Sequence, residues 1–279
     1  MVTLVFAVAV ALAVAGCGQK SRDNAQSQGQ QQNGEQKLSG SIQIAGSTSV
    51  QPLSEELAAA FMQKYPGVKI NVAGGGSGAG IKAAQQGTAD IGASSRELKD
   101  TEKGTVKETV IAKDGIAVIV HPDNPVENIS MEQIKGVFTG KITNWKDLGG
   151  KDAPITVIIR EAGSGTRGAF QELTIGEDAE FTDKAIIQNS NGALRTAVAG
   201  NPDAIGFISF GYINNEIKPL KVEGVEATKD NVLNGSYKIS RPFLYLTKGE
   251  PGGIVKAYID FVLSPEGQSI VGKEYIPVK

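Results

Sequence analysis

The sequence predicts an α/β fold in which parallel β-strands are flanked by α-helices. Between residues 41 and 87, a strand, a turn of small residues and a helix follow one another twice, and a third strand is expected at 89–93. The apolar run at 155–159 leads into another turn of this kind. Hydrophobic residues make up 40% of the 279 residues and charged residues 21%, which is typical of a globular protein. Alternating elements favour a parallel sheet with helices on both faces.

The elements of the first hundred residues follow from hydrophobic spacing and from helix-breaking residues. A strand is expected at 41–44, and a helix from about Pro52, because proline suits the first turn of a helix. Its buried face is predicted by Leu53, Leu57 and Phe61, which recur every four residues. The further elements expected here are a strand at 68–72, a helix that runs through Gln86 and is ended by Gly87, and a strand at 89–93.

The later elements are predicted in the same way. Ser130 begins a helix, since Gln133 three residues later completes a capping-box pattern. Ile134, Val137 and Phe138 are expected to face the core. The other predicted strands are 115–120, 155–159, 204–209 and 242–247, and the other helices are 168–173, 193–199, 254–263 and a short one capped by Ser264.

The N-terminus has the features of a targeting segment. Residues 2–16 are apolar or small except Thr3, and about 20 residues are needed to span a membrane. The small residues before Cys17, the only cysteine, resemble the lipobox of bacterial-type lipoproteins. We therefore expect residues 1–17 to be a lipoprotein signal peptide that ends at a lipidated Cys17, and 18–37 to be a disordered polar tether. The alternative is a chance cysteine in an ordinary signal peptide or short anchor.

Three turns rich in hydroxyl groups each precede or open a helix, at 47–49, 77–78 and 164–166. The first N–H groups of a helix have no partner within it, and the helix dipole makes them attractive to anions. Arg160 and Arg167 flank the third turn with planar guanidinium groups. The alternative is that serine and threonine serve only as helix N-caps. Capping does not explain the glycine spacing, so we favour three turns that converge on one anion.

Most enzyme classes are disfavoured by the residues present. The one histidine, His121, is followed by proline, and no nucleophile elbow, P-loop or His/Cys cluster for zinc occurs. The net charge of −2 disfavours nucleic-acid binding. One competitor remains, because Gly74, Gly76 and Ala79 match a loose dinucleotide fingerprint, with Glu97 near the place of its ribose acid.

Five stretches together carry a resemblance to a known family. They are GSTSVQP at 46–52, GGSGAG at 75–80, DIGASSR at 90–96, FTGKITNW at 138–145 and REAGSGT at 160–166. They resemble the phosphate-binding proteins of phosphate ABC transporters, the PstS type, over nearly all of residues 38–279. The resemblance implies a two-lobe periplasmic-binding-protein fold of type II that closes on inorganic phosphate. It implies delivery of phosphate to a transmembrane permease pair, with no catalysis, cofactor or metal.

The resemblance also implies the binding residues. The family motifs place these residues around phosphate: Ser47, Thr48, Ser49, Ser77, Ser95, Arg160, Ser164, Gly165 and Thr166. Enteric members have an aspartate where this chain has Ser95, and that aspartate accepts the proton of hydrogen phosphate. Ser95 is the expected acceptor here, with Glu161 and Asp90 as rivals. Sulfate or molybdate remains the alternative ligand within the class.

The predicted organisation follows from the same resemblance. One lobe is expected to comprise residues 38–114 plus 236–279, and the other residues 115–235, with the boundary near the apolar strand that begins at Gly115. The protein is expected to be a monomer that is held by its lipid anchor at the outer face of the cytoplasmic membrane or in the periplasm.

Overall fold

A computed structural model describes residues 38–278. The signal peptide, Cys17 and the polar tether predicted above lie outside these residues. The strands are β1 (Gly40–Gly46), β2 (Val68–Gly74), β3 (Ile91–Ser94), β4 (Lys107–Val120), β5 (Asn128–Ile129), β6 (Thr156–Arg160), β7 (Ile186–Gln188), β8 (Ala204–Ser209), β9 (Lys218–Pro219), β10 (Lys221–Val222) and β11 (Ser240–Thr247).

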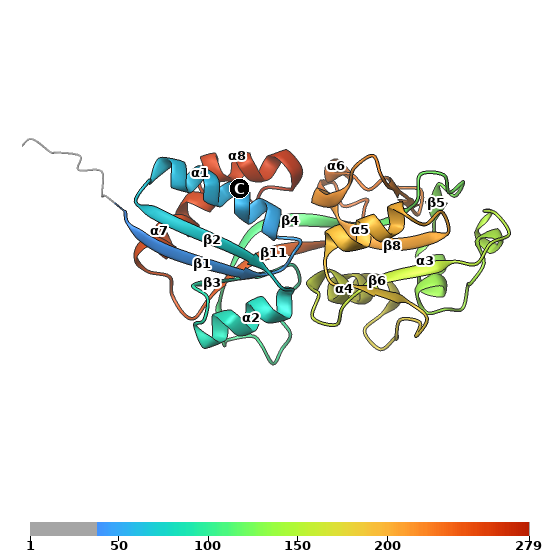
Figure 1. Ribbon diagram of the computed structural model, residues 1–279, viewed down its shortest axis with the longest axis horizontal. Coiled ribbons are helices and arrows are strands. Elements are labelled where there is room, and N and C mark those ends of the chain that lie inside the picture. Colours follow the sequence, from blue (N-terminus) through green and yellow to red (C-terminus); the bar gives the residue numbers. More distant parts are fainter. Residues whose placement is uncertain (1–37, 279) are drawn as a thin grey trace, which may run out of the picture. The chain divides into compact units, whose positions relative to one another are not determined.

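Helices alternate with these strands along much of the chain, as the sequence predicts (Figure 1). They are α1 (Gln51–Lys64), α2 (Ser77–Gln86), α3 (Met131–Phe138), α4 (Gly165–Phe170), α5 (Asn191–Ala199), α6 (Lys229–Leu233), α7 (Gly253–Val262) and α8 (Pro265–Glu274), with 3-10 turns η1 (Trp145–Leu148) and η3 (Phe210–Tyr212) and a π-helical turn η2 (Gln171–Ile175). Among residues 38–278, no helix has both the length and the hydrophobicity that crossing a membrane requires.

The main sheet is mixed rather than uniformly parallel. Its strand order is β2-β1-β3-β11-β4-β8-β6-β7, and β9 pairs with β4. Strand β1 is parallel to β2 and β3, and β6 is parallel to β7 and β8, which confirms the predicted parallel units. Strands β4 and β11 are antiparallel to their neighbours. Each parallel unit therefore carries its strand ends, and the turns that follow them, at one edge.

Strand β4 is the longest strand of the described chain and was underestimated from the sequence. It begins at Lys107 instead of the predicted Gly115, because residues 107–114 mix polar with apolar side chains and hide the strand. It pairs with β11 over its first part and with β8 over residues 116–120. One chain segment thus links the strands on both sides of it.

Two large groups of buried side chains lie along this path. One draws on β1–β3, β11, α1, α7, α8 and the first half of β4, and the other on residues 116–239 together with Ile276. The predicted faces of α1 and α3 are confirmed, because their apolar stripes are almost completely buried. A smaller group with Ile81 and Ala84 of α2 covers the opposite face of the sheet from α1. The lobe boundaries given above stay a prediction.

Helix starts differ from the sequence prediction at two places that matter for the site. Helix α4 begins at Gly165, three residues earlier than predicted, because the Ser164 side chain accepts a hydrogen bond from the Arg167 N–H group. Helix α5 begins at Asn191 rather than 193, because Ser190 caps it through the Ala193 N–H group. Both caps draw polar residues into the first turn of a helix.

Four phenylalanine rings pack together within the group of buried side chains from residues 116–239, and we predict that Phe207 is essential to its stability. The ring of Phe207 stacks on Phe170 with centroids 4.0 Å apart and also contacts Phe138 and Phe181. Phe207→Ala should lower the free energy of unfolding by about 3–5 kcal/mol, because it leaves a cavity that the neighbouring rings cannot fill. Urea-induced unfolding of the full chain measures this change.

Leu233→Ala is the matched control, because Leu233 is 63% exposed. It should change the free energy of unfolding by less than about 0.5 kcal/mol. Equal losses in the two variants would contradict this description of the core.

Candidate functional site

Hydroxyl groups from three separate turns meet at one buried place. Ser47 follows β1, Ser95 follows β3, and Ser77 begins α2. The Ser47 hydroxyl donates to Ser95 Oγ at 2.8 Å, and the Ser95 and Ser77 oxygens lie 3.3 Å apart. The Ser95 N–H group donates to Ser77 Oγ at 3.0 Å. All three side chains are 3% exposed or less, so these polar groups depend on one another for hydrogen bonds.

The turn at 164–166 lies directly against these hydroxyls. Ser49 Oγ and Thr166 Oγ1 are 2.7 Å apart, although 117 residues separate them in sequence. A Cβ atom added at Gly165 would lie 2.2 Å from Ser77 Oγ and 2.8 Å from Ser95 Oγ. Glycine is therefore required at this position by the close approach of backbone to side chain. We call the five hydroxyl residues Ser47, Ser49, Ser77, Ser95 and Thr166, together with Thr48, the hydroxyl cluster.

Simple helix capping does not account for the hydroxyl cluster. The N-cap residues of α1 and α2 are Val50 and Gly76, and neither helix has a side-chain cap. Only Ser164, before α4, caps its helix through the side chain among the three turns. The sequence alternative of capping alone therefore explains one turn of the three. The structure brings the three turns together, and their convergence on an anion stays a prediction.

Arg160, the last residue of β6, brings a buried positive charge to the cluster. Its side chain is 1% exposed and pairs with Glu161 through two bonds of 3.0 Å, from Nε to Oε2 and from Nη2 to Oε1. Its Nη2 also donates to Thr48 Oγ1 at 3.2 Å. Its Nη1 is buried and has no hydrogen-bond partner among the described residues. A buried guanidinium N–H without an acceptor is unfavourable, so this group is available to an anion.

Arg167 lies in α4 but turns to a different neighbour. Its Nη1 donates to the backbone oxygen of Arg160 at 3.0 Å. Its guanidinium carbon lies 4.9 Å from the centre of the Phe181 ring, a cation–π arrangement. The two arginines of the predicted cradle therefore have different partners, and only Arg160 contacts the hydroxyl cluster.

Asn191 was missed by the sequence analysis. It is fully buried at the start of α5, and its Nδ2 donates to Thr48 Oγ1 at 3.2 Å and to Ser49 Oγ at 2.8 Å. Its Oδ1 accepts from the Ser209 N–H group at 3.3 Å, which fixes the orientation of the amide. A signal was present, because the Ser-Asn-Gly turn at 190–192 lies between a strand and a helix like the other turns.

Arg241 and Asp114 were missed as well. They lie opposite each other on β11 and β4, and both are nearly completely buried. Arg241 donates to Asp114 Oδ2 from Nε at 3.2 Å and from Nη2 at 2.9 Å, and Nη2 also reaches Ser49 Oγ at 3.2 Å. Burial raises the pKa of the Asp114 carboxyl, and the Arg241 charge opposes that effect. A signal was present in the sequence, because Asp114 directly precedes the apolar run 115–120 and Arg241 precedes the run 242–246. A charged residue beside a buried strand usually needs a partner of opposite charge.

The three proposed proton acceptors have different surroundings. Ser95 Oγ lies within the hydroxyl cluster. Both carboxylate oxygens of Glu161 accept from Arg160. Asp90 is exposed, and its Oδ2 accepts from the Gln43 N–H group at 2.8 Å, a structural bond beside β1. Ser95 is thus the one of the three whose side-chain contacts are all with the other hydroxyls.

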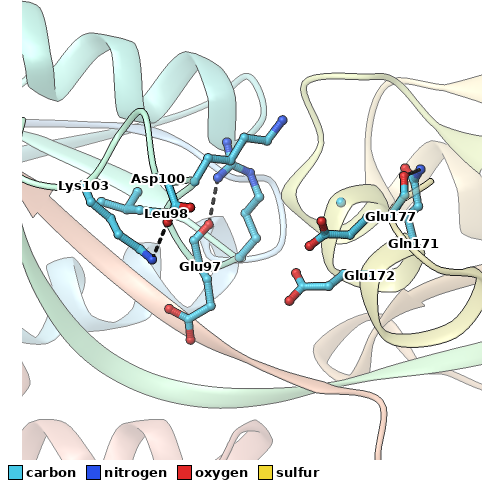
Figure 2. A pocket seen from close by; sticks show the side chains of 10 residues that line it. Glu97, Leu98, Asp100, Lys103, Gln171, Glu172 and Glu177 are labelled. Carbon is cyan, nitrogen blue, oxygen red and sulfur yellow. Dashed lines mark hydrogen bonds and ion pairs between the residues drawn. The ribbon is translucent and has the colours of Figure 1, made fainter.

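A groove of about 730 Å³ lies between residues 96–103 and residues 168–177 (Figure 2). It is lined by charges of both signs, with Lys99 and Lys103 on one side and Glu172 and Glu177 on the other. It contains none of the predicted site residues. Among residues 38–278, no group of three or more histidine, cysteine, aspartate or glutamate side chains is placed to hold a metal ion.

Comparisons with known proteins agree with the fold and with the family resemblance. A family model described as "PBP superfamily domain" matches residues 31–266. The phosphate-binding protein PstS of Bacillus subtilis is 34% identical over 284 residues, which cover 100% of this chain and 94% of that protein. The chain belongs to the PstS family. A second PstS relative, from Borreliella burgdorferi, is 31% identical over 84% of this chain and 88% of its own length.

Solved structures of related PstS-type proteins have the same fold. A putative phosphate ABC transporter substrate-binding protein from Clostridium perfringens, solved with bound phosphate, is 51% identical with a TM-score of 0.84, and the match covers 86% of this chain and 100% of that one. An ABC-type phosphate transport receptor from Vibrio cholerae is 38% identical with a TM-score of 0.72 over 84% and 99% of the two chains. The predicted α/β fold of a type II periplasmic binding protein is confirmed.

Gly165→Ala tests whether α4 packs against Ser77 in solution as tightly as the distances indicate. The added methyl group would overlap Ser77 Oγ, so the variant should lose about 1–3 kcal/mol of stability. Gly163→Ala is the matched control, because nothing lies within 4 Å of a Cβ atom at that position. Urea-induced unfolding of both variants measures the difference, and equal midpoints would show that the two surfaces do not meet.

Proposed function

We propose that this chain binds inorganic phosphate outside the cytoplasm and delivers it to the permease of a phosphate ABC transporter. The observation that carries the proposal is the convergence of three hydroxyl turns and one buried guanidinium at a single place. Membership of the PstS family supports the same ligand. In this proposal the protein is a carrier and catalyses no reaction.

The proposed ligand contacts are Ser47, Thr48, Ser49, Ser77, Ser95, Arg160, Ser164, Gly165 and Thr166. Their chemistry suits a small oxyanion, since hydroxyl and backbone N–H groups donate to oxygens and the N-terminus of α4 contributes a favourable dipole. The hydroxyls bond to one another in the structure, for example between Ser49 and Thr166. An anion would exchange these bonds for charge-assisted ones, which are stronger.

The choice between phosphate and sulfate depends on an acceptor in the site. Phosphate carries a proton at neutral pH and sulfate carries none, so a site of donors alone gives no reason to prefer phosphate. Ser95 is the proposed acceptor, because Glu161 already accepts from Arg160 and Asp90 accepts from a backbone N–H group of β1. A hydroxyl serves as donor or acceptor, so Ser95 can accept the ligand proton.

Calorimetric titration of the full chain with phosphate, sulfate, molybdate and a nucleotide tests the proposed function. Phosphate should bind most tightly, and the nucleotide should not bind. Ser95→Ala should reduce the ratio of phosphate affinity to sulfate affinity by about one to two decades. The reason is that the protonated oxygen of bound phosphate then has no acceptor for its hydrogen bond. A wild-type chain that prefers sulfate, molybdate or the nucleotide would contradict the proposed ligand. A preference that is unchanged in Ser95→Ala would assign the acceptor to another residue.

Arg160 should matter far more than Arg167 for phosphate binding. Arg160 contacts Thr48 in the hydroxyl cluster and has a free Nη1, whereas Arg167 lies against the Phe181 ring. Arg160→Ala should weaken binding by about 2–5 kcal/mol, because a desolvated charge partner is lost. Arg167→Ala is the comparison and should weaken it much less. Equal losses, or a larger loss in Arg167→Ala, would contradict this assignment.

We further propose that the folded part acts as a monomer with two lobes, 38–114 plus 236–279 and 115–235.

We also propose that Cys17 carries a lipid that anchors the protein to the membrane. Cys17 lies outside the described residues, so this proposal depends on the lipobox-like sequence alone. Cells labelled with a fatty-acid probe should incorporate it into the wild-type chain and not into Cys17→Ala. Equal labelling of both chains would exclude lipidation at this residue.

A further inference from the structure

The buried pair of Asp114 and Arg241 is part of the same polar network as the hydroxyl cluster. The two residues are opposite partners where β4 and β11 run side by side. Arg241 joins the pair to the cluster, because its Nη2 contacts both Asp114 Oδ2 and Ser49 Oγ. The motifs that identified the binding turns contain neither residue.

The hydrogen bonds around Ser49 fix the direction of its proton. Ser49 Oγ accepts from Arg241 Nη2 and from Asn191 Nδ2. A hydroxyl oxygen has two acceptor sites and one proton, so the Ser49 proton is left to bond Thr166 Oγ1. The Thr166 proton is then free for another acceptor. Arg241 and Asn191 together therefore leave the Thr166 hydroxyl free to donate to a ligand.

Thr48 shows the same arrangement beside the other arginine. Its Oγ1 accepts from Arg160 Nη2 and from Asn191 Nδ2, each at 3.2 Å. Its own proton is therefore also available to a ligand. Arg160 and Arg241 thus occupy equivalent places, each donating from Nη2 to a neighbouring hydroxyl and each held by a carboxylate.

The two guanidinium groups share one more feature. In each, Nη1 is buried and has no hydrogen-bond partner among residues 38–278. Buried polar groups almost always find a partner, and an unmatched N–H on a charged group is costly. The two unpaired Nη1 groups belong to arginines that contact the Thr48 and Ser49 hydroxyls. An anion with several acceptor oxygens is the kind of ligand that could bond to both.

We propose that Arg241 contacts the bound anion directly through Nη1, as a second cation beside Arg160, and that Asp114 is its positioning residue. This inference rests on the proposed function and names a contact that the sequence motifs do not contain. A second cation at the ligand adds more to the binding of a doubly charged anion than to that of a singly charged one. Arg241 thereby selects the dianionic form of phosphate.

The test compares phosphate affinity on the two sides of the second ionisation of phosphate. Full-length wild type and the double variant Asp114→Asn/Arg241→Gln are titrated by calorimetry at about pH 5.5 and about pH 8.5. The double variant removes both charges, so no buried charge is left unpaired. The ionisable groups that face Arg241 are Asp114 on β4, Arg160 on β6 and Tyr275 after α8, and burial keeps the Tyr275 pKa above its usual range.

The double variant should lose about tenfold or more in affinity at the higher pH, which is the effect expected of one charge-assisted hydrogen bond. Its loss at the lower pH should be clearly smaller, because the ligand there carries one negative charge. The matched control Arg96→Gln/Glu102→Gln removes a different two-bond ion pair, and it should bind like wild type at both pH values.

Each of four results would overturn the inference. Equal losses at both pH values would show a purely structural role, and an affinity within about twofold of wild type at the higher pH would show no contact. Wild type that binds no phosphate would refute the proposed function itself, and the inference with it. If the double variant does not fold, Arg241→Lys decides, because lysine lacks the planar fork in which Nε and Nη2 hold Asp114 while Nη1 stays free for the anion. It should bind phosphate at least threefold more weakly at the higher pH, and wild-type affinity would overturn the proposal.

Discussion

The burial of the Arg160 guanidinium is the constraint on which the site depends. A charge that is 1% exposed must be compensated where it lies, and Glu161, Thr48 and backbone oxygens do so from three directions. These partners come from the residue after β6, from the turn after β1, and from the last residue of β7 and the one that follows it. Placing the charge therefore requires segments far apart in sequence to meet, and the same meeting brings the hydroxyl turns together. Nη1 of Arg160 has no hydrogen-bond partner among the described residues, so it is the group that a ligand can contact.

Charge and hydrogen-bond direction act together in this arrangement. Each arginine is neutralised by its own carboxylate, so the buried region holds two cations without a large net charge. The arginines and Asn191 occupy the acceptor sites of Thr48 and Ser49, which leaves protons available elsewhere in the cluster. A preorganised set of donors in a dry interior binds an anion with little rearrangement. This agrees with the family, whose solved relative from Clostridium perfringens contains bound phosphate.

The sheet provides the geometry for these contacts. The turns after β1, β3 and β6 follow strands that are parallel within their own units, so each unit offers its turns at one edge. Strands β4 and β11 run antiparallel between the units and carry Asp114 and Arg241 to the same place. A ligand that contacts Arg241 would therefore also contact the segment that joins the two cores.

The sequence by itself determined the local elements, the helix-opening turns and the family, because these depend on residues close together in the chain. The spacing of Leu53, Leu57 and Phe61 gave the buried face of α1, and the glycine and hydroxyl pattern located the three turns. The tertiary structure alone decided which distant polar groups share a hydrogen bond. Arg241 meets Ser49 across 192 residues and Asn191 meets it across 142, and no local pattern encodes such a pairing. Burial is the physical reason, since a polar group removed from water must find its partner wherever the fold provides one.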